Sequence, residues 1–507
     1  MTTATDPVAT TTQGKLRGTT EGDGIFVFRG IPYGASTAGS GRFRPPQPAE
    51  AWTGERDATE FGPICPQQGP LVSGESQFMG GSPRLPLSED CLVLNVWTPA
   101  ADDGGKRPVM VWLHGRGFTA GAGSEDLYNG ANLARRGDAV IVTINHRLNI
   151  FGALHLADIG SSDFAGSGVV GMLDAVLALE WVRDNIEQFG GDPGNVTIFG
   201  ESGGGRKVCT LLAMPSAEGL FHRAIIQSSV TLRAIEADAA TEYAERLLAH
   251  LGIGSDELHK LQQLPFQELI DATNELTGGT GGTMPHAPVV DGDYFPVHPF
   301  DAVPTPTATK VPVIVGTNRD ENALFVARDP QRVGFDEDQL LERLDPLLGD
   351  RRDEILATYR EQRSDDSPWD LYVGITSESR RLAATKLAER ISAAGGEVFM
   401  YLFTWESDFR DGVLKASHAM EIPFVFDNVD VAPMTGERPD RSDLAESISE
   451  TWLAFARNGD PDREGAPHWP TYDAETRSTM ILDVPTRIED DPAAAERTVW
   501  GDLDIYR

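Results

Sequence analysis

The sequence predicts an α/β fold, in which one large and mostly parallel β-sheet has helices on both faces. Two observations support this prediction. Short, near-continuous apolar runs rich in β-branched residues recur along the chain, and each leads through a turn into a longer helical pattern. The predicted strands are residues 108–113, 139–145, 196–200, 223–228, 311–316 and 397–403.

One predicted helix lies between the second and third of these strands. Residues 171–191 read GMLDAVLALEWVRDNIEQFGG, which places apolar side chains on a broad side. The pattern stops at Gly190-Gly191, a good signal for a helix C-terminus. Residues 240–252 and 444–459 are similar, and each of these segments also ends at a glycine.

The 507 residues are expected to form a single domain, residues 1–507, with large insertions. The chain shows no internal repeat, no linker rich enough to separate domains and no long charge run. Residues 274–296 are rich in glycine, and a phosphate cradle is one interpretation of them. Their glycines precede no helix and follow no clear strand, so we favour a mobile surface loop.

Composition limits the class of partner. Hydrophobic residues make up 40% of the chain and charged residues 24%, as in ordinary soluble globular proteins. The net charge of −34 would repel a phosphate backbone and an anionic membrane surface, which argues against nucleic-acid binding. We interpret this charge as a solvated acidic surface; the alternative is that it steers a cationic substrate.

The N-terminal residues and the cysteines bear on location. The first residues contain no basic segment, apolar segment or cleavage site of a secretory signal, and no apolar run reaches the ~18 residues that span a bilayer. We therefore expect a cytoplasmic protein with no membrane partner. Cys65, Cys91 and Cys209 are too few for a disulfide framework. Three buried thiols and a single Cys65–Cys91 bridge both fit the sequence.

The segment Gly200-Glu201-Ser202-Gly203-Gly204 predicts a nucleophilic serine, because this G-x-S-x-G pattern lies between a β-branched strand and a helical run. In so sharp a turn, side chains at Gly200 or Gly204 would collide with neighbouring backbone, and Ser202 would be strained. The helix that follows would direct its first N–H groups at a developing negative charge. An ordinary turn is the alternative, since the pattern alone occurs by chance in glycine-rich chains.

A serine nucleophile needs a base and a carboxylate that orients the base; in this kind of fold the acid and then the histidine follow the serine. Asp320 and Glu321 both follow the strand at 311–316, and position alone does not choose between them. Only His418 and His468 lie after these acids. His468 lies in a proline-bounded surface turn, so we favour His418, although a lone histidine is more often structural.

The third requirement is an oxyanion hole. One N–H group comes from the residue after the nucleophile, Gly203, and others come from the loop after an early strand. Residues 114–118, HGRGF, form that loop. Each such donor contributes on the order of 3 kcal/mol to the barrier, so the loop geometry matters as much as the catalytic residues.

Eight segments carry a specific resemblance to a known family. They are FRGIPYG (28–34), RFRPPQP (42–48), SEDCLVLNVWTP (88–99), NHRLNIFGAL (145–154), FGGDPGNVTIFGESGGG (189–205), FHRAIIQSS (221–229), GTNRDENALF (316–325) and SHAMEIPFVF (417–426). Together they resemble the type B carboxylesterases, the cholinesterase-like branch of the α/β-hydrolases, and in particular the bacterial para-nitrobenzyl-esterase-like members. The resemblance implies an α/β-hydrolase fold with a large, mostly parallel sheet and long insertions.

The resemblance also implies the roles of five residues. It implies a catalytic triad of Ser202, Glu321 and His418, with glutamate rather than aspartate as the acid. It implies supporting roles for Glu201 and for Ser228, a serine near the acid.

The same resemblance implies oxyanion donors at Arg116, Gly117 and Gly203, and two of these depart from the usual pattern of the family. Gly203 stands where alanine is usual. Glycine still provides an N–H group, so this difference is expected to be benign. Arg116 replaces the middle glycine of a triple glycine. Many secreted relatives bridge the cysteines that match Cys65 and Cys91.

Two interpretations of Arg116 remain open. In the first, which we favour, the loop has a conformation that Arg adopts and the side chain points to the acidic surface. In the second, Arg116 narrows the substrate pocket or pairs with a substrate carboxylate. Arg at a positive φ would store roughly 1–3 kcal/mol of strain.

The expected function is hydrolysis of small to medium uncharged carboxylic esters through an acyl-enzyme. Carbamate or amide hydrolysis uses the same chemistry and is the alternative. A non-catalytic binding or adhesion protein is disfavoured because the three triad residues are present, and a lipase because no strongly amphipathic lid is evident. We expect no cofactor and no metal, since no H-E-x-x-H motif or dinucleotide fingerprint occurs. A monomer or weak homo-oligomer is expected.

Overall fold

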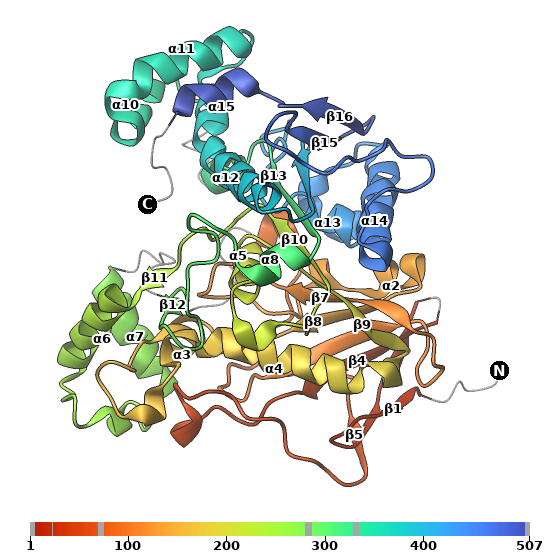
Figure 1. The fold of residues 1–507 in the computed structure, drawn as a ribbon, viewed down its shortest axis with the longest axis vertical. Coiled ribbons are helices and arrows are strands. Elements are labelled where there is room, and N and C mark those ends of the chain that lie inside the picture. Colours follow the sequence, from red (N-terminus) through yellow and green to blue (C-terminus); the bar gives the residue numbers. More distant parts are fainter. Residues whose placement is uncertain (1–5, 23, 69–75, 279–285, 328–333, 502–507) are drawn as a thin grey trace.

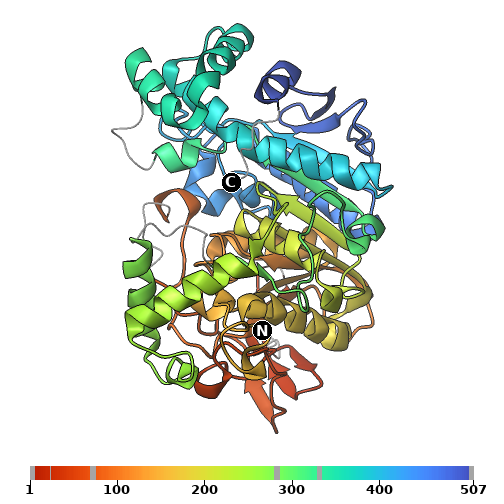
Figure 2. The same cartoon turned by 60° about the vertical axis from the view of Figure 1, so that its left-hand side comes forward.

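The structure is a computed structural model that describes residues 6–22, 24–68, 76–278, 286–327 and 334–501. At its centre is one eleven-stranded sheet, with helices on both faces (Figure 1, Figure 2). The predicted α/β fold is confirmed.

All six predicted strands are present and form the middle of this sheet. They are β7 (Arg107–Leu113), β8 (Val140–Ile144), β9 (Gly191–Glu201), β10 (Arg223–Gln227), β13 (Val313–Asn318) and β14 (Val398–Phe403). They pair in parallel in the order β8-β7-β9-β10-β13-β14. Their carboxyl ends therefore lie at one edge of the sheet, where sites form in α/β folds.

The two sides of the sheet are mixed, which the sequence did not predict. Beside β8 lie three antiparallel strands: β6 (Val93–Thr98), β4 (Ile25–Pro32) and β3 (Thr19–Glu21). Beyond β14 lie the parallel β15 (Ser478–Leu482) and the antiparallel β16 (Arg487–Asp490). Antiparallel neighbours need no crossover helix between them, so the strand–helix alternation does not reveal β3, β4, β6 and β16.

Successive side chains of the strands enter two different cores. Val111 packs in one core and Trp112 in the other, as expected for a sheet covered on both faces. One face is covered by α4 (Val170–Asn185), α5 (Gly203–Leu211) and α12 (Pro368–Ala393), and the other by α2 (Ala131–Gly137), α13 (Ile422–Val425) and α14 (Arg441–Asn458).

Further helices lie in two groups at the periphery of the molecule, one at the lower left and one at the top of Figure 1. They are α6 (Ala237–Leu251) with α7 (Phe266–Thr277), and α10 (Glu337–Leu348) with α11 (Arg352–Gln362) and α15 (Ala494–Trp500). The three helices predicted from the sequence correspond to α4, α6 and α14 and are confirmed.

Two predictions about segments need adjustment. The predicted loop at 274–296 is wrong at its start, because α7 continues to Thr277; residues 279–285 lie outside the described residues. The stretch Ser162–Phe189 is long and apolar enough to span a membrane, although no such run was expected. In its most apolar part, 89% of the residues are buried inside the protein, as in the core helix of a globular protein.

The cysteines are buried free thiols in this structure. A hydrogen bond with Cys65, together with burial, raises the pKa of the Cys91 thiol well above its usual range. Of the two possibilities that fit the sequence, the structure therefore has the unbridged one.

Candidate active site

Ser202 lies in the turn between β9 and α5, with φ +56° and ψ −118°. This is the strained backbone expected of a nucleophile elbow. A Cβ at Gly204 would lie 1.9 Å from the carbonyl oxygen of Leu113, and a Cβ at Gly200 would lie 2.6 Å from the carbonyl carbon of Gly204. Only glycine fits at these two positions, as the sequence predicts.

Glu321 and His418 meet at the carboxyl edge of the sheet. Nδ1 of His418 lies 2.5 Å from Oε2 of Glu321, and the two residues are 5% and 0% exposed. The other oxygen, Oε1, accepts a hydrogen bond of 3.0 Å from the backbone N–H of Asn318. An imidazole whose Nδ1–H donates to a carboxylate presents Nε2 as the base.

Nε2 of His418 faces the serine turn. It lies 3.2 Å from Oε1 of Glu201, the residue directly before Ser202. His468, the other candidate base, lies elsewhere: its side chain is 77% exposed and pairs with Asp462. The structure therefore joins His418 to Glu321 and places Nε2 of His418 beside Glu201, the residue that precedes Ser202.

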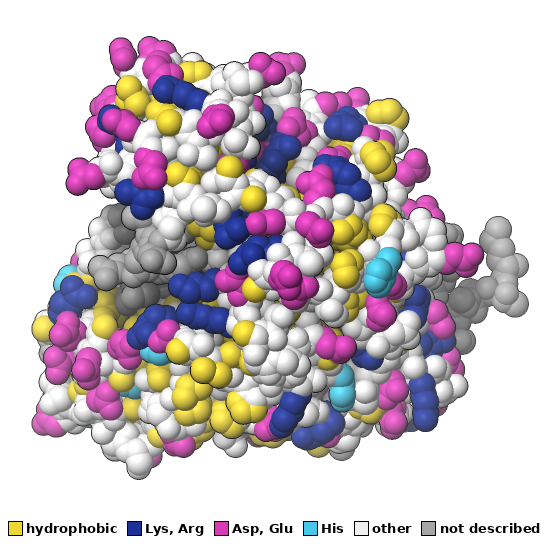
Figure 3. Space-filling view, turned by 45° about the horizontal axis from the view of Figure 1, so that its top comes forward, with side chains coloured by type: hydrophobic (Ala, Val, Ile, Leu, Met, Phe, Trp, Pro, Cys, Tyr) yellow, Lys and Arg dark blue, Asp and Glu magenta, His cyan; other side chains and the backbone are white. Residues whose placement is uncertain are grey.

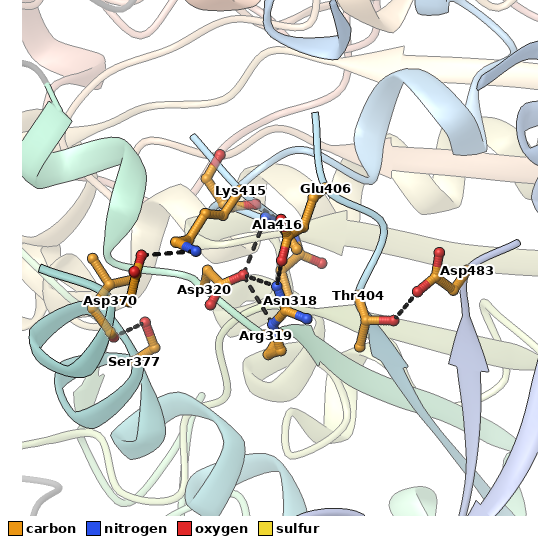
Figure 4. Close-up of polar contacts among 12 residues, drawn as sticks. Asn318, Arg319, Asp320, Asp370, Ser377, Thr404, Glu406, Lys415, Ala416 and Asp483 are labelled. Carbon is orange, nitrogen blue, oxygen red and sulfur yellow. Dashed lines mark hydrogen bonds and ion pairs between the residues drawn. The ribbon is translucent and has the colours of Figure 1, made fainter. Parts of the chain in front are cut away.

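Asp320 was the other candidate for the catalytic acid. In the structure it connects two loops instead of contacting His418. Its Oδ2 accepts hydrogen bonds from Arg319 at 2.7 Å and from the backbone N–H of Ala416 at 3.2 Å (Figure 4). Its own N–H donates to the carbonyl oxygen of Ala416 at 3.0 Å. Lys415 extends this connection through an ion pair of 2.8 Å with Asp370 of α12. Asp320 thus ties the loop that carries the acid to the loop that carries the histidine.

Three buried carboxyl groups crowd the site: Glu201, Glu321 and Glu421. Burial and then the charges of Glu421 and Glu321 raise the pKa of Glu201 well above its usual range. Burial and the charge of Glu321 raise the pKa of Glu421 to about 7. Both shifts favour the neutral forms of Glu201 and Glu421 beside the third carboxyl group, Glu321.

Glu421 was missed in the sequence, although it follows the histidine by three residues. Its Oε1 accepts hydrogen bonds from Gln227 at 3.2 Å and from the Ser228 hydroxyl at 3.3 Å. Its Oε2 accepts one of 2.5 Å from the side chain of Asn318, whose backbone N–H binds Glu321. Ser228, predicted to support the acid, therefore acts on Glu421 and reaches Glu321 only through this network.

The predicted oxyanion donors Gly117 and Gly203 lie against each other. A Cβ at Gly203 would lie 2.2 Å from the oxygen and 2.4 Å from the nitrogen of Gly117. Within the described residues, neither of these two N–H groups donates to an acceptor, and the N–H groups of a first helical turn have no partner in their own helix. Arg116 and Gly117 have φ values of +63° and +62°, so the loop holds Arg116 in the left-handed region.

The side chain of Arg116 does not point to the surface, so the favoured interpretation is wrong on this point. It is 15% exposed, and it pairs with Glu125, whose side chain is 4% exposed. Nε lies 3.1 Å from Oε1 and Nη2 lies 3.4 Å from Oε2. Its charge also lowers the pKa of Glu201, against the larger effect of burial. A positive charge therefore lies beside the site, with Glu125 as a partner.

Lys207 is a second residue that the sequence analysis missed. It lies on α5, is 0% exposed, and donates a hydrogen bond of 2.7 Å from Nζ to the carbonyl oxygen of His114. Nζ also lies 5.8 Å from the ring centre of Phe118. Burial lowers the pKa of Lys207 to about 7. Since His114 and Phe118 border the oxyanion loop, Lys207 fastens that loop to the helix of the nucleophile.

These features define the class of the protein. The protein is a serine hydrolase of the α/β-hydrolase fold. This class is defined by a serine on a strained strand–helix turn, a histidine held by a buried glutamate, and glycine N–H groups beside the serine. Among the residues that the structure describes, no group of three or more His, Cys, Asp or Glu side chains is placed to hold a metal ion.

Comparison with known proteins identifies the family. The model of the Carboxylesterase family matches residues 5–500, and the chain belongs to this family. It is 38% identical to the para-nitrobenzyl esterase of Bacillus subtilis, over 97% of this chain and 98% of that protein. It is 35% identical to the phenmedipham hydrolase of Pseudarthrobacter oxydans, over 94% and 95% of the two chains.

Solved structures agree with this assignment. The crystal structure of the carboxylesterase from Geobacillus stearothermophilus has a TM-score of 0.84 and 39% identity, and the match covers 97% of this chain and 99% of that one. The predicted family, the α/β-hydrolase fold and the class of carboxylic ester hydrolase are confirmed.

Gly203→Ala is expected to lower kcat about 10- to 100-fold with a smaller change in KM. The new methyl group displaces Gly117 and so moves oxyanion donors whose contribution is made in the transition state. Steady-state kinetics on p-nitrophenyl butyrate measure the effect. Gly194→Ala, at an exposed position where the new Cβ meets only the Asp192 side chain, is the control. An unchanged kcat in Gly203→Ala contradicts the close approach of the loop.

Arg116→Gly is expected to destabilise the protein by about 2 kcal/mol. Glycine relieves roughly 1 kcal/mol of backbone strain, whereas removing one partner of a buried ion pair costs about 3 kcal/mol or more. Arg116→Gly with Glu125→Gln is expected to recover most of the loss, because no carboxylate is then left without this cation. Chemical denaturation measures both variants. Arg116→Gly as stable as the wild type shows that the ion pair is not required.

Glu421→Gln is expected to change how stability depends on pH. The folded pKa of about 7 lies above the ordinary value of 4.5, so the folded protein binds more protons between these values and loses stability as pH rises through them. Relative to the wild type, the variant therefore gains about 2–3 kcal/mol between pH 5 and pH 8. Urea denaturation at the two pH values measures this gain. Glu437→Gln, at an exposed site, is the control; a gain independent of pH refutes the assignment.

Proposed function

We propose that this carboxylesterase works through Ser202, His418 and Glu321 and an acyl-enzyme intermediate. The observation that carries the proposal is the position of His418. Its Nδ1 is held 2.5 Å from Glu321, and its Nε2 faces the strained turn that presents Ser202. This arrangement suits the transfer of a proton between the serine and the leaving group.

In the first half of the reaction, Oγ of Ser202 attacks the ester carbonyl while Nε2 of His418 takes the serine proton. The carbonyl oxygen becomes negative, and the N–H groups of Gly117 and Gly203 lie where a hole for it would form. The C–O bond to the alcohol then breaks, and the alcohol leaves with the proton from His418. In the second half, water gives a proton to His418 and attacks the acyl carbon; the bond between that carbon and Oγ of Ser202 then breaks, His418 returns the proton to Oγ, and the acid is released.

The substrate is proposed to be a small-molecule ester. The relatives' names refer to para-nitrobenzyl esters and to phenmedipham, which supports a pocket that accepts small organic molecules. Cytoplasmic location and a monomeric or weakly associated state stay predictions, and the catalytic proposal does not depend on them.

Ser202→Ala is expected to lower the turnover of p-nitrophenyl butyrate by at least about 10³-fold, because the covalent route is lost. Intact-mass measurement after treatment with a serine-directed organophosphonate should show a single adduct on the wild type and none on the variant. Ser216→Ala, an exposed serine at the end of the same strand–helix unit, should behave as wild type. An active or labelled Ser202→Ala protein rejects the assigned nucleophile.

A further inference from the structure

The oxyanion loop, residues 114–118, packs directly on the turn that carries the nucleophile. A Cβ at Gly115 would lie 3.7 Å from the Cβ of Ser202 and 3.1 Å from Oε2 of Glu201. Two positions later in the loop, the nitrogen of Gly117 would lie 2.4 Å from a Cβ at Gly203. The position of the loop relative to the turn therefore decides whether the N–H groups of Gly117 and Gly203 converge on one oxygen.

One side chain contacts both ends of this loop. Nζ of Lys207 donates to the carbonyl oxygen of His114 at 2.7 Å and lies 5.8 Å from the ring centre of Phe118. His114 is the first residue of the loop and Phe118 is the last. Lys207 itself belongs to α5, the helix that begins directly after Ser202. The nucleophile and the oxyanion loop are therefore joined through a single helix.

The burial of Lys207 calls for a physical reason. On the face drawn in Figure 3, lysine and arginine side chains lie at the surface among acidic ones, where charged groups are usually found. Lys207 is 0% exposed, and within the described part of the chain no carboxylate pairs with it. An apolar side chain of similar size would fill this space without the cost of removing an amino group from water. What an apolar side chain lacks is the hydrogen bond to His114.

This hydrogen bond does not depend on the charge of Lys207, because an ammonium group and a neutral amine both carry N–H groups. The ring of His114 stacks on that of His146 with centres 5.2 Å apart, and both residues are 1% exposed. Burial and then the charge of Lys207 lower the pKa of each ring well below its usual range, so both rings stay neutral. The stacked ring and the hydrogen bond together fix the start of the loop.

We propose that Lys207 is a positioning residue for ester hydrolysis, which holds the oxyanion loop where both of its glycine donors reach the developing oxyanion. Lys207 is fully buried and acts through the loop, without touching the substrate. A displaced loop weakens the transition state more than the bound ester, because the negative oxygen is present only in the transition state. This inference rests on the proposed function and goes beyond it, since it assigns a role to a residue outside the triad.

Lys207→Met removes the donor and keeps a long, unbranched side chain. We expect kcat for p-nitrophenyl butyrate, per active site titrated with the organophosphonate, to fall at least about 10-fold while KM changes less than about 3-fold. Lys207→Leu is a second apolar variant with the same expected result, for use if the methionine variant does not fold. An unchanged kcat per active site overturns the proposal.

A transition-state analogue separates positioning from a general loss of structure. Propyl trifluoromethyl ketone has the same propyl chain as the butyrate, and its adduct with the serine carries the negative oxygen of the tetrahedral intermediate. We expect the affinity for this ketone to fall in Lys207→Met by about the same factor as kcat/KM. A lower kcat with an unchanged affinity for the ketone overturns the proposal.

Thr210→Val is the matched control on the same helix. Thr210 is 0% exposed, and its hydroxyl donates to the carbonyl oxygen of Arg206 at 3.0 Å, within α5. This variant also loses a buried hydrogen bond, and we expect it to leave kcat per active site and the affinity for the ketone unchanged. If it lowers kcat as much as Lys207→Met does, any disturbance of α5 has this effect, and the positioning role is overturned.

The wild-type protein tests the proposed function separately. A wild type that hydrolyses the ester, together with a Lys207→Met protein of equal kcat, overturns the positioning role alone. A wild type that neither hydrolyses p-nitrophenyl butyrate nor forms an organophosphonate adduct overturns the proposed function, and the positioning role with it.

Discussion

The structure depends on how closely helix α5 approaches strand β7. A Cβ at Gly204 would lie 1.9 Å from the carbonyl oxygen of Leu113, the last residue of that strand. This approach lets the chain leave β9 in a turn sharp enough to hold Ser202 at φ +56°. It also places the start of α5 next to the loop that follows β7, so one contact fixes both the nucleophile and the oxyanion loop.

The parts predicted from the sequence are those that local patterns determine. The six central strands are near-continuous apolar runs because both of their faces are buried, and the glycines at 200 and 204 mark the sharp turn. Among the flanking strands, β6 is equally buried, but it is not followed by a helix in the chain, and β3 and β16 have exposed or partly exposed residues. Asp320 and Glu321 illustrate a different limit: adjacent acids in one loop point in different directions, and residue order does not tell which one meets His418.

Other site residues escaped prediction because their roles depend on contacts across the fold. Lys207 looks like an ordinary helical lysine, yet its ammonium group is buried against the carbonyl oxygen of His114, which is 93 positions away. Glu421 likewise acquires its role from neighbours on other elements. The sequence also placed the Arg116 side chain at the surface, since its partner Glu125 has no distinguishing pattern around it.

The contact between Gly203 and Gly117 limits the order in which substitutions can produce this loop geometry. Relatives that the sequence resembles carry alanine at the first of these positions and glycine at the position of Arg116. With the loop as close as it is here, a methyl group at position 203 has no space. Position 203 is therefore sterically coupled to Gly117, the residue that follows Arg116. A chain with alanine at 203 does not acquire this loop geometry by changing position 116 alone. The loss of that methyl group has to come first or together with the change.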